Sequence, residues 1–366
     1  MELKRLVVIG GLRVDVFMNS DSTPGLGESV LANESLGGRG ANMAVAARRS
    51  CRDKKSLKSQ PGDKIEVRLI GLVGQDEYGN RFESELKKDG IVTDDIVRKP
   101  GTCTSICFVM IDSYTRQNRC LFTRGATANW SKEQLTKPSE LGSGIWPDLV
   151  VVQMEMDRAT VEKMIEVAGQ GQVELCLKAT PASPIAKSTY RHITHFIVNE
   201  SEAAIMSGRP RDEINKDTWL SVAREFINFG AKNVVITLGA MGAFYATAEE
   251  SGRCLAYGVD VVDTTGAGDV FTGTYASEYL RQKGNGAWNI RDAVTRANKA
   301  AALAVQRIGA QTGIPWADEI DAFSAPPNDE PIRESPFELY LRLDASGNPT
   351  GSFKNVPREV EVIMKQ

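Results

Sequence analysis

The chain has 366 residues, 42% of them hydrophobic and 25% charged, so it can form the large core of an ordinary globular protein. Its 44 Lys and Arg against 47 Asp and Glu give a net charge of -3, which offers no electrostatic surface for nucleic acid or an anionic membrane. Only two histidines are present, His192 and His195, which leaves almost no material for a zinc site or a Ser-His-Asp triad.

The six cysteines are scattered along the chain, and no apolar run approaches the roughly 18 residues that a membrane helix needs. Scattered cysteines in a long chain are typical of reduced thiols. We therefore expect a cytoplasmic protein without a signal peptide.

Short runs that are apolar on both faces alternate with helical stretches along most of the chain. Strands of this kind are covered by helices on both sides, which predicts an α/β fold with a doubly wound, mainly parallel sheet. The expected strands are 6–9, 67–73, 149–152, 173–177, 196–198 and 234–238.

Residues 102–124 break this rhythm, because polar and apolar residues alternate there across a polar turn. This pattern predicts a half-exposed antiparallel hairpin, which with 13–36 would form a small antiparallel β lid. One domain is expected over 1–323. The segment 324–366 would be a C-terminal extension that opens as a linker and carries two strand-like stretches, FELYLRLD and VEVIMK, and the basic segment 52–64 would be a solvated loop.

Polar residues and glycines follow several expected strands. Ligands of open α/β sheets bind beyond the carboxyl ends of the strands, so these positions are candidates for a site. They are Gln153, Glu155, Asn199, Glu202, Thr237, Gly239 and Gly242. For Asn199 alone, a helix cap is the simpler interpretation. Several such positions in succession indicate a polyanion with a metal.

The segment DTTGAGD, 263–269, is the strongest local signal. A helix is predicted from about Gly268 to just before Gly284, and the small residues before it leave backbone N–H groups open at its positive end, which is an anion site. Asp269 would lie where the anion and its reaction partner meet, although capping alone would also favour a carboxylate. A Rossmann site is excluded because position 271 is Phe, and no Walker-type loop is present.

Near the N-terminus, the segment GGRGAN, 37–42, opens an Ala-rich helix. Its glycines permit close backbone approach, and Arg39 and Asn42 offer hydrogen-bond donors. A tight contact between helix and sheet is the alternative. Asp15, after the first strand, is typical either of a turn or of a site for sugar hydroxyls.

Taken together, GGRGAN, Asn199-x-x-Glu202, the segment 237–242 and DTTGAGD resemble the ribokinase branch of the phosphofructokinase-B-type carbohydrate kinases over about 6–323. The resemblance implies an ATP-dependent kinase that converts D-ribose to its 5-phosphate and forms a homodimer through the lid. A kinase for another sugar or a nucleoside is the alternative. A catalytically weak sugar-binding or regulatory protein is a third.

The resemblance also implies roles for single residues. Asp269 would be the general base, and the amides of Gly266, Ala267 and Gly268 would form the anion hole. The sugar would be bound by Arg13, Asp15, Gly38, Arg39, Gly40, Asn42, Glu155 and Asp269. The nucleotide would be bound by Asn199, Thr237, Gly239, Gly242, Gly268 and Asn298. Glu202 would hold Mg²⁺ through water, and K⁺ would bind mostly backbone carbonyls around Asp263, Thr265, Ala304, Arg307, Gly309 and Gly313.

Four positions depart from the family pattern. Arg13 stands where Asn is usual, Arg39 replaces Lys, Gly313 replaces a serine, and 178–181 reads KATP where the family begins with Asn-Pro. Arg13 would crowd out ribose, recruit an acidic or phosphorylated substrate, or turn away to solvent.

Overall fold

The computed structural model describes residues 3–20, 32–54, 64–112, 118–123, 125–130 and 137–328. Residues 1–327 form one compact unit, and 328–366 form a second. The strands predicted for the C-terminal extension lie outside the described residues, so they and the boundary at 323 stay predictions.

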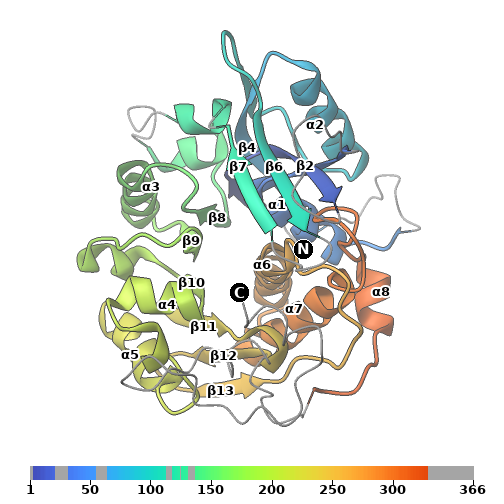
Figure 1. Ribbon diagram of the computed structural model, residues 1–366. Coiled ribbons are helices and arrows are strands. Elements are labelled where there is room, and N and C mark those ends of the chain that lie inside the picture. Colours follow the sequence, from blue (N-terminus) through green and yellow to red (C-terminus); the bar gives the residue numbers. More distant parts are fainter. Residues whose placement is uncertain are drawn as a thin grey trace, which may run out of the picture. The chain divides into compact units, whose positions relative to one another are not determined.

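A nine-stranded sheet forms the centre of the first unit, in the order β13-β12-β11-β10-β9-β8-β1-β4-β5 (Figure 1). Only β12 runs in the opposite direction to the other strands, and it pairs antiparallel with β11 and with the edge strand β13. The strands are β1 (Lys4–Ile9), β4 (Ile65–Gly74), β5 (Ile96–Lys99), β8 (Leu149–Gln153), β9 (Glu174–Lys178), β10 (His195–Asn199), β11 (Asn233–Thr237), β12 (Ala243–Ala246) and β13 (Ser251–Cys254). The predicted doubly wound sheet is confirmed.

Helices cover both faces of this sheet, as the apolar runs require. In β1, Leu6 and Val8 point into one core, whereas Val7 and Ile9 point into the other. The first core lies under α1 (Arg39–Ser50), α2 (Glu77–Lys88), α6 (Ala267–Gly284), α7 (Ile290–Ala304) and α8 (Ala317–Ala322). The second lies under α3 (Arg158–Gln170), α4 (Glu200–Ser207) and α5 (Trp219–Asn228). No helix in the described ranges is long and apolar enough to cross a membrane.

A second sheet of four strands forms the predicted lid, in the order β3-β2-β6-β7. Its strands are β2 (Arg13–Ser20), β3 (Ala32–Gly37), β6 (Ser105–Asp112) and β7 (Asn118–Phe122). The two outer pairs are antiparallel as predicted, but the central pair β2–β6 is parallel. The chain passes through α1, β4, α2 and β5 between these two strands and so returns in the same direction.

Helices α1 and α6 run side by side in the same direction at the centre of the unit (Figure 1). Gly273 permits this contact, because a Cβ there would lie only 2.3 Å from the backbone oxygen of Met43. Further along, the hydroxyls of Ser50 and Ser277 are 2.7 Å apart. The two helices therefore begin at the same edge of the sheet.

The prediction of a solvated loop over 52–64 is wrong at its first residue. Arg52 is buried, and its backbone oxygen accepts a hydrogen bond from the amide of Ala317, because α8 packs at this point. Asp53 and Lys54 are exposed, and 55–63 lie outside the described residues.

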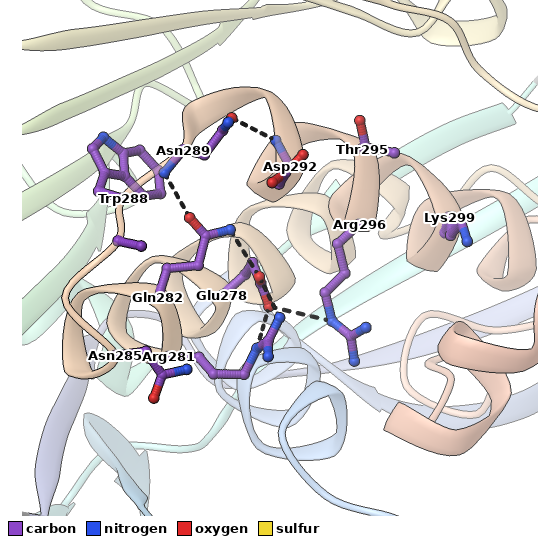
Figure 2. A pocket seen from close by; sticks show the side chains of 11 residues that line it. Glu278, Arg281, Gln282, Asn285, Trp288, Asn289, Asp292, Thr295, Arg296 and Lys299 are labelled. Carbon is purple, nitrogen blue, oxygen red and sulfur yellow. Dashed lines mark hydrogen bonds and ion pairs between the residues drawn. The ribbon is translucent and has the colours of Figure 1, made fainter. Parts of the chain in front are cut away.

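The far half of α6 carries a second buried carboxylate, Glu278, beside a hollow of about 670 Å³ between α6 and α7 (Figure 2). Arg281 donates to both of its oxygens at 2.7 Å, and Gln282 Nε2 donates at 2.9 Å. Arg296 Nε lies 3.5 Å away. The hydrogen bonds lie within α6, and the ion pair with Arg296 joins this helix to α7.

Candidate active site

A cavity of about 580 Å³ lies where the lid meets the carboxyl ends of β1 and β8. Chain connections proceed from β1 to β4 on one side and from β8 to β9 on the other, so the strand order reverses between β1 and β8. Such a reversal is the place where open α/β sheets bind ligands. The lid contributes Arg13, Phe122 and Thr123, and the segment after β8 contributes Glu155 and Met156.

Asp269 lies buried in the first turn of α6. Its Oδ2 accepts a hydrogen bond of 2.9 Å from Asn42 Nδ2 on α1, although the two residues are 227 positions apart in the chain. Its Oδ1 makes no hydrogen bond within the described residues, and Arg39 Nη1 lies 3.9 Å away. Burial raises the pKa of the Asp269 carboxyl, against the opposing effect of Arg39 and Asn42. Asp269 thus retains capacity to accept a proton.

The amides before Asp269 differ in what they offer. Gly266 caps α6 with φ 77°, a conformation that favours glycine. Ala267 N–H already donates to the backbone oxygen of Thr264 at 3.2 Å, whereas Gly268 N–H has no acceptor in the described part of the chain. Of the predicted anion hole, the amide of Gly268 is therefore open at the positive end of the helix.

Four side chains form an ionic cluster at the cavity. Arg13 Nε donates to Asp15 Oδ1 at 2.8 Å, and Arg13 Nη1 lies 3.6 Å from Glu155. Arg39 Nε lies 3.4 Å from the same Glu155 oxygen. The Arg13 guanidinium also lies 5.3 Å from the centre of the Phe122 ring. Of the three predictions for Arg13, the turn to solvent is therefore wrong, because two carboxylates and an aromatic ring hold it inside.

Burial also changes the pKa of the two acids in this cluster. It raises the pKa of Asp15 and of Glu155, although the neighbouring guanidinium groups act in the opposite direction. The two arginines face three carboxylates, Asp15, Glu155 and Asp269. The cluster therefore presents no unbalanced positive charge to a ligand.

The glycines of the segment 37–42 make the tight contact that was the alternative interpretation. A Cβ on Gly38 or Gly40 would lie 2.6 Å from the backbone of Gly11 or Gly10, and Gly38 has φ 89°. The same contact brings Asn42 to Asp269. Packing and a role in the site therefore coincide in this segment.

The predicted nucleotide residues are mostly engaged by the protein itself. Asn199 caps α4, since its Oδ1 accepts from Glu202 N at 2.7 Å, as the simpler interpretation proposed. Asn298 Nδ2 donates to the backbone oxygens of Cys254 and Leu255, both at 3.2 Å. Gly242 has φ 94° and packs against the same segment, whereas Gly239 faces open space. Thr237 Oγ1 donates to the oxygen of Val198 at 3.3 Å.

Glu202 has partners that the sequence motifs did not reveal. Lys178 Nζ donates to its Oε2 at 2.6 Å, and Thr180 Oγ1 donates to its Oε1. The amide of Asn199 is a third donor, at 2.7 Å. With an ammonium and two other donors on its carboxylate, Glu202 does not offer the free oxygens that a water-bound Mg²⁺ would need in this conformation. Its predicted metal role stays a prediction.

The residues predicted for K⁺ lie in two segments that meet. Asp263 accepts from Thr265 N at 2.8 Å and from Gly309 N at 2.9 Å. Burial acts to raise the pKa of Asp263, but these hydrogen bonds outweigh it and lower the pKa. A Cβ on Gly313 would lie 3.0 Å from the oxygen of Ala304 and 3.1 Å from that of Gly309. Arg307 directs its side chain to Glu319. Oxygen atoms of this kind suit a hard monovalent cation.

The sequence motifs also did not reveal several residues that line the cavity or lie near it. Thr127 Oγ1 donates to the oxygen of Leu12 at 3.3 Å and accepts from Ser105. Phe122 was identified only as part of the hairpin. Lys178 and Thr180 were noted as a departure from the family pattern, without a role. Nothing local in the sequence shows that these residues meet.

Comparison with known proteins settles the family. The model of the pfkB family of carbohydrate kinases matches residues 3–317. The chain belongs to this family. The ribokinase of Schizosaccharomyces pombe is 30% identical over 323 residues, which are 86% of this chain and 96% of that protein. The deoxyribokinase of Salmonella typhi is 28% identical over 87% of this chain and 98% of its own length.

A solved structure agrees with this membership. Ribokinase from Thermotoga maritima is 26% identical and matches with a TM-score of 0.71, over 88% of this chain and 99% of its own. The pfkB membership confirms the predicted enzyme class, an ATP-dependent sugar kinase.

Proposed function

We propose that this pfkB kinase transfers the γ-phosphoryl group of ATP to the primary hydroxyl of a neutral pentose, with D-ribose as the first candidate. One observation carries the proposal. Asp269 is buried beside the open amide of Gly268 at the start of α6, and Arg39 connects it to the cavity. Phosphoryl transfer requires a base and an anion site close to each other, and here they lie on adjacent residues.

Asp269 takes the proton of the sugar hydroxyl as its oxygen bonds to phosphorus and the bond to the leaving ADP oxygen breaks. Asn42 holds one Asp269 oxygen at 2.9 Å, so the other oxygen is directed to the substrate. Burial raises the pKa of Asp269, which makes the carboxylate a stronger base. The open amide of Gly268 and the positive end of α6 stabilise the charge on the transferred group.

The charge balance of the cavity favours a neutral sugar over a phosphorylated one. Arg13 and Arg39 are paired with Asp15 and Glu155, so an anionic substrate would have to displace carboxylates that are already bound. Arg13 already binds one of the two carboxylate oxygens of Asp15, which leaves the other oxygen for sugar hydroxyls. The curated relatives include both a ribokinase and a deoxyribokinase, so the 2-hydroxyl is the group to vary.

The cations of the reaction are part of this proposal. We infer that ATP enters as its magnesium complex and that K⁺ binds between Asp263 and the 304–313 segment, whose carbonyl and carboxylate oxygens fit it. A cation there would add positive charge behind the start of α6. A cytoplasmic location also remains a proposal.

We also propose a homodimer that forms through the lid. Leu121 and Phe122, on the edge strand β7, are 62% and 61% exposed and would be covered by a second lid. Ile106 and Phe108 on β6 pack partly against the core and are less available for such a contact. Sedimentation velocity at micromolar concentration tests this dimer, and a monomer alone would contradict it.

The function is tested by phosphate transfer from MgATP to D-ribose, 2-deoxy-D-ribose, a ketose, a hexose and a nucleoside, with and without K⁺. We expect the highest kcat/KM for D-ribose and a lower rate without K⁺. Nucleotide binding without turnover on any sugar would contradict the proposal and favour a sugar-binding protein. A higher kcat/KM for the nucleoside than for any sugar would identify nucleosides as the substrate class.

A further inference from the structure

Lys178 is a buried lysine at the carboxyl end of β9. A buried ammonium group is costly unless it is paired, and Glu202 Oε2 at 2.6 Å is its partner. Among the described residues, Glu202 is the only hydrogen-bond acceptor for Lys178 Nζ. Two of its three N–H groups therefore remain for another acceptor.

These N–H groups lie beside the start of α6. A Cβ placed on Gly268 would be 3.9 Å from Lys178 Cε, so the end of the lysine side chain lies near this glycine. The amide of Gly268 has no acceptor in the described part of the chain. The charge of Lys178 also acts on the carboxyl of Asp269, the next residue. An ammonium, an open amide and the proposed base therefore lie near one another at the start of α6.

Two helix starts add to the positive potential here. Asn199 and Glu202 lie at the start of α4, and Gly268 lies at the start of α6. Glu202 balances Lys178 as long as no anion is present. A polyphosphate at α6 would meet an ammonium that is already buried and oriented, so little reorganisation would be needed.

We propose that Lys178 binds the transferred phosphoryl group together with the Gly268 amide. This inference rests on the proposed function and deepens it. Lys178 forms no covalent bond and loses no proton in the step: the sugar oxygen bonds to phosphorus, the bond to the ADP oxygen breaks, and the hydroxyl proton goes to Asp269. Lys178 stabilises the negative charge on the oxygens of the group in transit.

The competing explanation is that Lys178 only neutralises Glu202. Lys178→Met alone does not separate the two, because it leaves Glu202 as an unpaired buried carboxylate next to the phosphates. Lys178→Met combined with Glu202→Gln removes both charges and keeps the net charge unchanged. Glu202→Gln alone is the reference, because it includes whatever Glu202 itself contributes to magnesium binding. If neutralisation is the whole role of Lys178, the double variant has the same kcat as Glu202→Gln.

We expect the double variant to remain slow. Its kcat for the best sugar should lie about 10²–10³-fold below that of Glu202→Gln, the usual effect of losing one oriented donor to a transition state. Calorimetric titration should show about tenfold weaker binding of a non-hydrolysable ATP analogue, as expected for one lost charge-assisted hydrogen bond, and ADP binding should change by less than about threefold. Melting temperatures check that each variant is folded.

Lys283→Met is the matched control. Lys283 pairs with Glu174 at 2.7 Å at the far end of the same helix, and its kcat should equal that of the wild type. A double variant with kcat within about threefold of that of Glu202→Gln alone, or with ADP and the analogue weakened equally, overturns the inference. A wild type without sugar phosphorylation contradicts the proposed function instead, and the two binding measurements then decide the role of Lys178.

Discussion

Helix α6 carries a buried carboxylate near each end, and the two differ in how many donors they meet. Glu278 receives two hydrogen bonds from Arg281 and one from Gln282. Asp269 receives one, from Asn42, and a guanidinium lies 3.9 Å away. Both side chains are almost fully buried. Burial alone therefore does not mark a reactive acid.

The difference lies in how completely the protein satisfies each carboxylate. A fully hydrogen-bonded carboxylate fixes neighbouring elements in place, as Glu278 does between α6 and α7. A carboxylate with one unused oxygen beside a cavity keeps that oxygen for a ligand, and its burial raises the pKa. The hollow in Figure 2 is similar in volume to the cavity beneath the lid, yet its acid has no such oxygen to offer.

Asp269→Asn should produce the largest effect on catalysis. The amide keeps the size and the contact with α1 but accepts no proton, so kcat should fall by about 10²–10⁴-fold while ATP and sugar still bind. Steady-state kinetics and calorimetry measure both. Near-normal turnover would rule out Asp269 as the base.

Glu278→Gln, at the other end of the helix, should reduce stability and leave catalysis nearly unchanged. Arg281 and Arg296 lose their charged partner, which should lower the free energy of unfolding by about 1–3 kcal/mol with little change in kcat. Denaturant titration measures the loss. A large drop in kcat at full stability would mean that this end of α6 also serves catalysis.

Activity and stability should both depend on the ionisation of Asp269. Asp269 must be ionised to act as a base, and its pKa is raised by burial, so kcat/KM should fall about tenfold per pH unit below a midpoint that lies above pH 3.8. Because the pKa of Asp269 is higher in the folded than in the unfolded chain, the protonated side chain stabilises the fold at low pH. This stabilisation is lost as the pH rises through the folded-state pKa of Asp269. Asp269→Asn should therefore gain stability relative to the wild type as the pH rises. A constant difference between pH 4 and pH 7 would contradict the raised pKa.

Gly273 lies between the two carboxylates and sets the spacing of α1 and α6. Gly273→Ala places a Cβ against the backbone oxygen of Met43, so we expect a loss of about 1–3 kcal/mol in unfolding free energy and a smaller loss of kcat, since Asn42 shifts relative to Asp269. In Gly284→Ala the new Cβ meets nothing within 4 Å, and stability should stay equal or rise slightly. Equal stabilities of the two variants would contradict this account.

Arg13→Asn should have the smallest effect. It frees the Asp15 oxygen that Arg13 now binds at 2.8 Å, and one such hydrogen bond is worth about 1 kcal/mol. The KM for D-ribose should therefore fall roughly fivefold, with kcat nearly unchanged. A higher KM would show that Arg13 itself contacts the sugar.

The parallel strands and the start of α6 could be predicted because their signals are local. Apolar runs covered on both faces and a glycine-rich turn before a helix have the same meaning in any α/β protein. The segment 263–269 predicted the helix start to within a residue, since α6 begins at Ala267.

Contacts between distant segments could not be predicted in this way. Lys178 and Glu202 are both charged residues at strand or helix ends, and nothing local indicates that they pair with each other and not with solvent. Arg13 was noticed as unusual, but its orientation depends on Phe122, Glu155 and Asp15, which come from separate elements. The parallel pairing of β2 with β6 likewise follows from the path of the chain between them.

The lid is joined to the main sheet by a very short link. Only Gly10, Gly11 and Leu12 separate β1 from β2, and Leu12 is fully buried. If the lid rotates about this link, its residues move in proportion to their distance from it, so Arg13 and Asp15 move least and the opposite ends of β2 and β6 move most. A change far out on the lid would therefore alter access to the cavity without altering the position of Asp15, the residue proposed to bind the sugar.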